Sequence, residues 1–363
     1  MNTEKSEQIR DKKTDRSTWV PTNPDYDPEK PMQIGGQAVL EGVMMRAPGS
    51  VATAVRRANG SIVVKHQPFV SLVEKYRMLK LPVVRGAVGL IDMLYLGIQT
   101  LNWSGEIAMM DIEPNKAKSN GNGTPSKKNS QNSKLGVVLA LVVALVVGIG
   151  VFFVTPLFVT TKLFHLEQDA FSFNLVAGGI RIAILLAYLA AISFMKDIRR
   201  LFQYHGGEHK AVFAFELKDE LSPGVVLQRS RFHPRCGTSF LLIVMFVAIV
   251  SFAFLDLLVK QLAGTMTLPL RLLTHLPFIP VVGGLSYEII RFSAKHSTSW
   301  WGRILIAPGL WLQRITTKEP DASQVEVALV ALRCALGLED PARYPLQPVA
   351  SSVNPPSAVA GHR

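Results

Sequence analysis

Long apolar stretches are the strongest pattern along this chain. From Leu135 to Thr161 no charged residue occurs for about 27 residues, which exceeds the roughly 20 residues that span a bilayer as a helix. Three further apolar stretches follow, at 170–195 with only Arg181 inside, at 236–255, and at 272–290 with Pro277 and Pro280 inside. The pattern predicts an α-helical membrane protein with about four transmembrane helices in residues 135–295.

The chain before these stretches predicts a small α/β part. ATAVRR and SIVVKH are short β-prone runs, and Asn59-Gly60 between them is a pair that favours a tight hairpin. We expect a β-hairpin and an amphipathic helix in residues 32–110, on the cytoplasmic side. Residues 82–103 are apolar but include Arg85 and Asp92. A helix at the membrane interface or packed on the core therefore fits better than a further span, which remains the alternative.

Polar segments divide the rest of the chain. They are a disordered N-terminus at 1–31, a disordered linker at 111–134, a cytoplasmic loop at 196–235 and a disordered tail at 339–363. In residues 296–338 we expect interfacial and cytoplasmic helices. The first is a surface-lying segment with Trp300, Trp301 and Trp311 at headgroup depth, and the second is one short amphipathic helix.

Composition and charge agree with a membrane protein. The chain is 48% hydrophobic and only 18% charged, and its net charge is +12. Lysine and arginine concentrate in the linker, in the 196–235 loop and after the fourth span, whereas the opposite loops contain few. By the positive-inside rule, both termini are expected in the cytoplasm. No zinc-finger, homeodomain or RNA-binding signature accompanies the positive charge, which argues against a nucleic-acid partner.

The 196–235 loop contains the best candidate for chemistry. YHGGEHK places His205, Glu208 and His209 in the order H-x-x-E-H, an inverted zinc-binding pattern. On a helix, the two imidazoles are one turn apart on one face and can reach one ion, and Glu208 beside them can accept a proton from bound water. Gly206-Gly207 is a poor helix interior, so the alternative is a polar loop whose histidines satisfy backbone groups or lipid phosphates.

Three other places add candidate ligands or carboxylates. His233 and Cys236 lie where the chain re-enters the membrane, and Glu288 lies at the end of the fourth span, so all are expected at one membrane face. The alternatives are a proline turn with a buried thiol and, for Glu288, an interfacial ion pair. Glu41 is a candidate catalytic carboxylate near the hairpin, although a structural turn is the better interpretation of its position.

Several motifs together resemble the YqhQ-like family of bacterial integral membrane proteins. In chain order they are GGQAVLEGVMMRAP, LPVVRGAVGLIDML, HGGEHKAVFAFE, HPRCGTSF, GGLSYEIIR and PGLWLQRITTKEPDASQVEVAL, spread over residues 32–335. The family has a domain of unknown function and is often labelled a predicted metal-dependent enzyme. The resemblance implies a bacterial cytoplasmic-membrane protein, and it favours as functional residues Glu41, His205, Glu208, His209, His233, Cys236 and Glu288. Gly207 departs from the alanine that is usual there, which leaves the helix geometry in doubt.

These observations favour an enzyme of hydrolase type with a divalent metal, zinc first among the candidates. His205, His209 and Cys236 would bind the metal, with His233 and Glu288 as further candidate ligands, and Glu208 would act as the base. The expected partners are the lipid bilayer and a lipid headgroup or another membrane protein, with a homo-oligomer left open. The competing hypothesis is a non-catalytic membrane scaffold or assembly factor.

Overall fold

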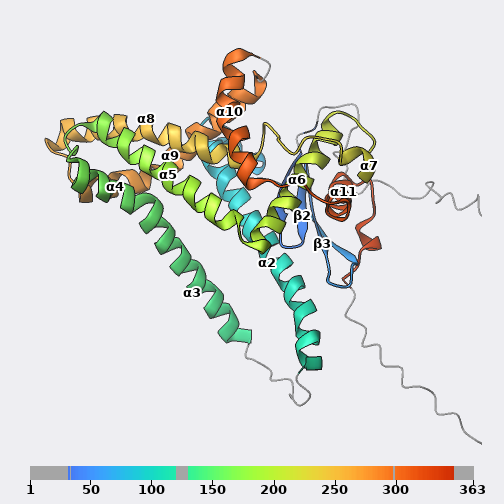
Figure 1. The fold of residues 1–363 in the computed structure, drawn as a ribbon. Helices are drawn as coiled ribbons and strands as arrows, with labels where there is room; N and C mark the ends of the chain where they lie inside the picture. Colours follow the sequence, from blue (N-terminus) through green and yellow to red (C-terminus); the bar gives the residue numbers. More distant parts are fainter. Residues whose placement is uncertain (1–31, 33, 120–129, 297–298, 347–363) are drawn as a thin grey trace, which may run out of the picture.

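A small antiparallel sheet and a set of long helices form the part of the chain that this computed structural model describes, residues 32, 34–119, 130–296 and 299–346 (Figure 1). The strands are β1 (Gly35–Val39), β2 (Gly42–Ala47), β3 (Ser50–Arg56) and β4 (Ile62–Pro68). The longer helices are α2 (Val84–Ser119), α3 (Ser130–Ile149), α5 (Ala170–Ser193), α6 (Lys196–Glu216), α8 (Gly237–Ala263), α9 (Leu268–Lys295), α10 (Trp300–Thr316) and α11 (Ala322–Leu336). The short ones are α1 (Leu72–Lys75), η1 (Arg77–Lys80), η2 (Gly150–Val154), α4 (Thr155–Val159), η3 (Thr160–Phe164), α7 (Pro223–Val226) and η4 (Pro341–Arg343).

The sheet is a meander in which each strand pairs with the next in sequence. β3 and β4 are joined across Asn59-Gly60, with Gly60 at a φ of 86°, so the predicted hairpin is confirmed. The pattern did not reveal β1 and β2, which are joined by a tight turn with Glu41 at a φ of 54°. The α/β part is therefore a four-stranded sheet rather than a single hairpin.

Helices α6 and α11 cover one face of the sheet and, with α7, share one apolar core with it. We call these strands and helices the sheet unit. The sequence predicts an amphipathic helix at α11, but every residue from 327 to 332 is buried. A capping box of Asp321 and Gln324 begins this helix, and Gly337 in the left-handed region ends it. The helix is apolar on almost all sides because it is the centre of the unit.

Among the described residues, five helices are long and apolar enough to cross a membrane, one more than expected. They are Val84–Asp111, Val142–Phe164, Ala170–Ser193, Gly237–Ala263 and Leu268–Ser293. The number of candidate spans thus differs from the expected four, and the additional candidate is α2. Helix α2 contains too few charged residues for its composition to exclude a membrane span, but these residues make specific contacts.

The second half of α2 packs on the sheet. Ile107 lies in an apolar cluster with Val39, Val55 and Val63, and Asp111 accepts a hydrogen bond from Arg57 at 2.6 Å. Figure 1 shows α2 passing beside β2 and β3, while α5, α8 and α9 extend away to the other side.

The predicted linker and tail are partly covered by the described residues. Helix α2 continues to Ser119 and α3 begins at Ser130, so helix extends into both ends of the 111–134 segment, and residues 120–129 lie outside the described part. Residues 339–346 include η4, and Val64 N–H donates to the carbonyl of Tyr344. Residues 1–31 and 347–363 lie outside the described part.

Helix α10 turns one face inward and leaves tryptophans outside. Leu312, Gln313 and Thr316 are buried, whereas Trp300 is 74% and Trp311 49% exposed. The side chain of Trp301 lies outside the described part of the structure. The exposed rings suit the predicted surface position, and their depth in a membrane stays a prediction.

A buried polar cluster joins α5, α8 and α9. Asp256 is fully buried and accepts hydrogen bonds from Arg271 Nε at 2.9 Å and Asn174 Nδ2 at 2.6 Å, and His275 Nε2 lies 2.7 Å from its other oxygen. Arg181 lies against the rings of Phe153 and Phe252 nearby. The sequence analysis singled out Arg181 alone, because Asp256 and Arg271 lie near the ends of their apolar runs.

Replacing Asp256 with Asn should destabilise the bundle strongly. Removing one partner of a buried ion pair typically costs about 3–5 kcal/mol, because the remaining charge is left without compensation. Thermal unfolding in detergent should show a large decrease in midpoint for Asp256→Asn and almost none for Gln261→Ala, an exposed position on the same helix. Equal midpoints for the two variants would contradict a structural role of the cluster.

Candidate metal centre

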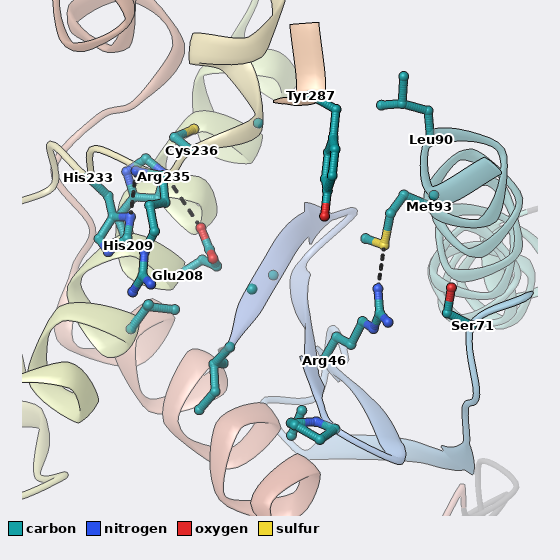
Figure 2. Close-up of a pocket in the computed structure, with 18 of the residues that line it drawn as sticks. Arg46, Ser71, Leu90, Met93, Glu208, His209, His233, Arg235, Cys236 and Tyr287 are labelled. Carbon is teal, nitrogen blue, oxygen red and sulfur yellow. Dashed lines mark hydrogen bonds and ion pairs between the residues drawn. The ribbon is translucent and has the colours of Figure 1, made fainter. Parts of the chain in front are cut away.

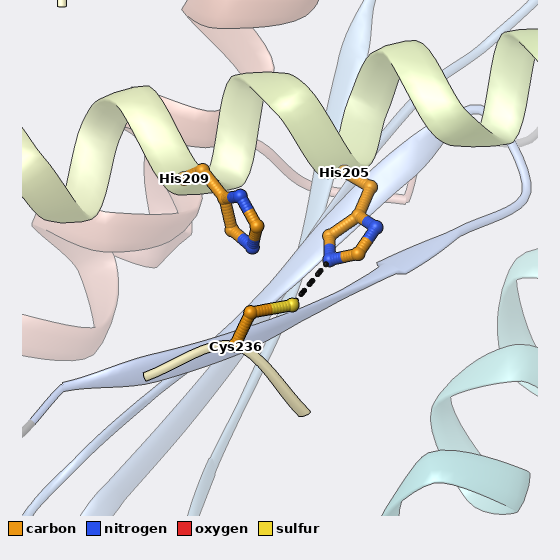
Figure 3. Close-up of side chains that lie close together, drawn as sticks. All are labelled: His205, His209 and Cys236. Carbon is orange, nitrogen blue, oxygen red and sulfur yellow. Dashed lines mark hydrogen bonds between the residues drawn. The ribbon is translucent and has the colours of Figure 1, made fainter. Parts of the chain in front are cut away.

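Helix α6 is continuous through Gly206-Gly207, which removes the doubt raised by the two glycines. A Cβ atom at Gly206 would lie 2.1 Å from the carbonyl oxygen of Lys318, whereas one at Gly207 would meet nothing closer than 3.6 Å. Gly206 therefore allows a close approach of backbone, and Gly207 could be alanine. The regular helix places His205 and His209 one turn apart on one face, with ring centroids 4.5 Å apart (Figure 3).

Backbone carbonyls hold both imidazole rings by their Nδ1 atoms. His205 Nδ1 lies 2.9 Å from the oxygen of Thr316, and His209 Nδ1 lies 2.5 Å from the oxygen of Arg231. A carbonyl only accepts, so each Nδ1 donates, and in a neutral ring this leaves the lone pair on Nε2. Burial lowers the pKa of His209, which favours that neutral ring. Both histidines are thus oriented as metal ligands usually are.

Cys236 completes a group of three donors. It precedes the first residue of α8, where its sulfur accepts from the N–H of Thr238, and Sγ lies 3.3 Å from His205 Nε2. The ligand atoms of His205, His209 and Cys236 all lie within 4.8 Å of one another. Bonds of about 2.0–2.3 Å to one tetrahedral zinc ion place its ligands roughly 3.3–3.8 Å apart, so a small inward adjustment suffices.

His209 Nε2 gives a second indication that something belongs at this point. The atom is buried and has no hydrogen bond of normal geometry among the described residues. Its polar neighbours are the thiol of Cys236 and Glu208 Oε2, which at 3.6 Å is too distant for a hydrogen bond. Buried polar atoms are rarely left unpaired in a native protein. A metal ion between the two Nε2 atoms and the thiol would satisfy it.

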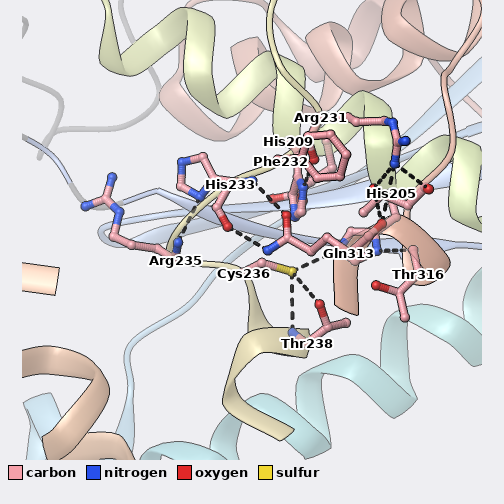
Figure 4. A network of polar contacts seen from close by, with 12 residues as sticks. His205, His209, Arg231, Phe232, His233, Arg235, Cys236, Thr238, Gln313 and Thr316 are labelled. Carbon is pink, nitrogen blue, oxygen red and sulfur yellow. Dashed lines mark hydrogen bonds and ion pairs between the residues drawn. The ribbon is translucent and has the colours of Figure 1, made fainter. Parts of the chain in front are cut away.

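Gln313 on α10 fixes the turn that presents Cys236 (Figure 4). Its Oε1 accepts from the N–H of His233, and its Nε2 donates to the carbonyl of the same residue, both at 2.8 Å. The side chain is fully buried. Sequence reasoning missed Gln313, since a lone glutamine in an apolar helix has no pattern that distinguishes it.

His233 lies beside the group but points elsewhere. Its ring centroid is 5.7 Å from that of His209, whereas its Nε2 is 3.3 Å from Glu216 Oε2. Burial by itself would raise the pKa of Glu216, but the bond with His233 and the charge of Arg235 lower it overall. The structure thus gives His233 a carboxylate partner outside the three-donor group.

Glu208 is held at the edge of the group by the first strand of the sheet. It is buried, the N–H of Gly36 donates to its carboxylate, and burial raises its pKa against the opposing effects of His205 and His233. A Cβ at position 36 would lie 2.6 Å from Glu208 Cγ and 2.8 Å from the carbonyl of Met44. Only glycine at this position lets the carboxylate pack so close to the sheet.

The three donors and Glu208 line a cavity of about 560 Å³ between the sheet unit and α2. Figure 2 shows Cys236, His209 and Glu208 on one wall, Arg46 and Met93 on the facing wall, and the ring of Tyr287 between them. The donors are therefore accessible from a space large enough for a small organic group.

The remaining two candidates lie outside the group. Glu41 is bonded to Arg200 and accepts from the hydroxyl of Tyr204 at 3.2 Å, and Glu288 is bonded to Arg85 at 2.7 Å. The ion pair expected for Glu288 is present, with Arg85 of α2 as its partner.

Comparison with known proteins places the chain in a family. A family model described as protein of unknown function (DUF1385) matches residues 81–338, which include all three donors. The chain belongs to this family. It is 34% identical over 322 residues to the uncharacterized protein YqhQ of Bacillus subtilis (strain 168), covering 85% of this chain and 94% of that protein. The resemblance seen in the motifs is thereby confirmed. No solved structure matches the chain.

Replacing Gly36 with alanine should displace Glu208 and destabilise the fold. Overpacking of this kind typically costs about 1–3 kcal/mol. The neighbouring Gly35 is a matched control, because a Cβ there would meet nothing within 4 Å, and Gly35→Ala should change stability by less than about 0.5 kcal/mol. Chemical unfolding in detergent compares the two, and similar losses in both variants would show that Gly36 is not tightly packed.

The two cysteines should differ in reactivity. Burial raises the pKa of Cys334 to about 12, and its thiol lies in the core of the sheet unit, whereas Cys236 lines the cavity. The thiolate is the reactive form, so a small alkylating reagent should label Cys236 first in the metal-free folded protein. Zinc should suppress that labelling, as followed by mass spectrometry, and denaturation should expose both thiols. Labelling of Cys236 that is indifferent to zinc would contradict the metal centre.

Proposed function

We propose that this protein is a metal-dependent enzyme, of hydrolase type, whose site faces the cytoplasmic side of a bacterial inner membrane. The observation that carries the proposal is the convergence of His205 Nε2, His209 Nε2 and Cys236 Sγ on one point in the wall of a cavity. Three protein ligands with a further position open are typical of catalytic zinc sites, whereas structural sites are closed by four. A bound zinc ion supplies a Lewis acid to an oxygen of the substrate.

Each protein group then has a definite task. His205 and His209 bind through Nε2 while the carbonyls of Thr316 and Arg231 keep their rings in place. Cys236 binds as thiolate. Glu208, which has a raised pKa and lies beside His209, holds or accepts a proton at its carboxylate, as a general base or acid does.

The position of α2 supports a site at the membrane surface. Arg85 near its start is bonded to Glu288 of α9, and Asp111 in its second half is bonded to Arg57 beside β3. We therefore infer that α2 lies along the sheet unit rather than crossing the bilayer. Its outer residues Ile91, Leu94 and Tyr95 are exposed and apolar, as suits a helix in contact with lipid. The lysine- and arginine-rich flanks support a cytoplasmic sheet unit.

Metal content tests the centre directly. The full chain, purified in detergent without chelator, should contain about one zinc per molecule by elemental analysis, as a single three-ligand site requires. His205→Ala and Cys236→Ala should lose it, and Cys334→Ala is the matched control that should keep it. Absence of stoichiometric metal in the unmodified protein would end the proposal.

The Glu208→Gln variant separates an enzyme from a scaffold. Because the amide has nearly the shape of the carboxyl group, the variant should keep its zinc and its fold but lose proton transfer, with a rate loss of about 10²–10⁴-fold. In a strain that lacks the gene, it should fail to restore whatever phenotype the wild type restores. Glu106→Gln, exposed on α2, is the control, and full rescue by Glu208→Gln would favour a scaffold.

A further inference from the structure

The cavity has two chemically different walls. One wall contains the donor group and Glu208, and the opposite wall contains Arg46 from β2 together with Leu90 and Met93 from α2 (Figure 2). The donor wall suits the reacting bond of a substrate. The opposite wall suits whatever part of the substrate determines which molecule is accepted.

Arg46 is the least neutralised of the three arginines that line the cavity. Arg85 and Arg235 are each bonded to a carboxylate, Glu288 and Glu216 respectively. Arg46 donates to the sulfur of Met93 at 3.2 Å, a weak acceptor. Its nearest carboxylate, that of Glu74, is 3.7 Å away and more than half exposed. Glu74 also lines the cavity, so Arg46 is the most weakly paired of the three arginines rather than an unpaired one.

The position of Arg46 is fixed although its charge is poorly compensated. Its guanidinium lies 4.7 Å from the centroid of the Phe69 ring, and its strand pairs with β1 and β3 on both sides. A pre-oriented guanidinium binds phosphate oxygens with two parallel hydrogen bonds. Little ordering is then lost when a ligand arrives.

Beside Arg46, part of the cavity lining is apolar and includes residues of α2. Ile34, Leu90, Met93 and Val212 line it beside the ring of Tyr287. Leu94 and Tyr95, on the same helix as Leu90, are exposed. A ligand on this side of the cavity meets the weakly paired guanidinium of Arg46 next to a hydrocarbon surface. An anionic amphiphile has the complementary combination, a negative headgroup joined to an apolar chain.

We propose that the cavity binds a phosphate-bearing membrane amphiphile, with Arg46 contacting the phosphate and the donor group facing the bond that reacts. The proposal deepens the function proposed above and rests on it. Arg46 has the role of a binding and specificity residue, and it takes no part in holding the metal. A phosphate in this position orients the headgroup between the two walls while the acyl part remains along α2.

Binding measurements on the zinc-loaded full chain in an uncharged detergent test this assignment. The probes are dioctanoyl phosphatidic acid, the uncharged dioctanoylglycerol and inorganic phosphate, with affinity measured by titration calorimetry. Phosphatidic acid should bind at least about tenfold more tightly than dioctanoylglycerol, since a hydrogen bond to a charged group is worth this factor or more. Inorganic phosphate should bind more weakly than the lipid. If inorganic phosphate bound as tightly as phosphatidic acid, the proposal that the ligand is a membrane lipid would be overturned.

Arg46→Gln isolates the contribution of the guanidinium. It should weaken binding of phosphatidic acid by roughly 10-fold to 100-fold and leave that of dioctanoylglycerol unchanged, and Arg46→Lys should recover part of the loss. Arg343→Gln, at an exposed position outside the cavity, is the matched control and should bind as the wild type does.

Zinc content and the unfolding midpoint, measured on the same samples, distinguish the two proposals. Arg46→Gln should keep both. Unchanged lipid affinity in a folded, zinc-containing Arg46→Gln protein would overturn the role of Arg46 and leave the metal centre standing. A wild type without zinc would instead overturn the proposed function.

Discussion

A six-residue segment, 313–318 at the end of α10, organises the whole candidate site. Gln313 bonds the backbone of His233, the carbonyl of Thr316 holds His205, and Thr317 accepts from Arg231, whose own carbonyl holds His209. The carbonyl of Lys318 contacts α6 where Gly206 has no side chain. Helix α6, the start of α8 and the entry to α11 are thereby connected through one stretch of backbone.

This arrangement explains why both imidazoles can present Nε2 to the same point. Without these bonds, more than one rotamer and ring orientation would be open to each histidine. Here the Nδ1 bonds of 2.9 and 2.5 Å select one orientation for each ring, and burial lowers the pKa of His209. The geometry is present before any ligand arrives, as effective binding and catalysis require.

The sequence predicted those parts of the molecule that are determined by residues close to one another in the chain. The apolar spans, the hairpin at Asn59-Gly60 and the facing histidines all follow from residues close in sequence. The contacts of α2 could not be predicted in this way. An apolar helix that packs on a sheet and one that lies in lipid have similar sequences. The partners of Gln313, Gly36 and Arg46 could not be identified from the sequence, since each partner lies more than 40 residues away, as Glu208 does from Gly36.

The complete burial of α11 has a consequence for biogenesis. Strands β1 to β4 are synthesised before the helices that cover them. The part of their apolar face that packs against α11 stays uncovered until residue 336 has left the ribosome, after the intervening apolar helices have emerged. During that interval the nascent sheet exposes hydrophobic surface to aggregation. Truncation shortly before α11 would therefore be expected to yield an inserted but misassembled protein, a natural substrate for quality-control proteases.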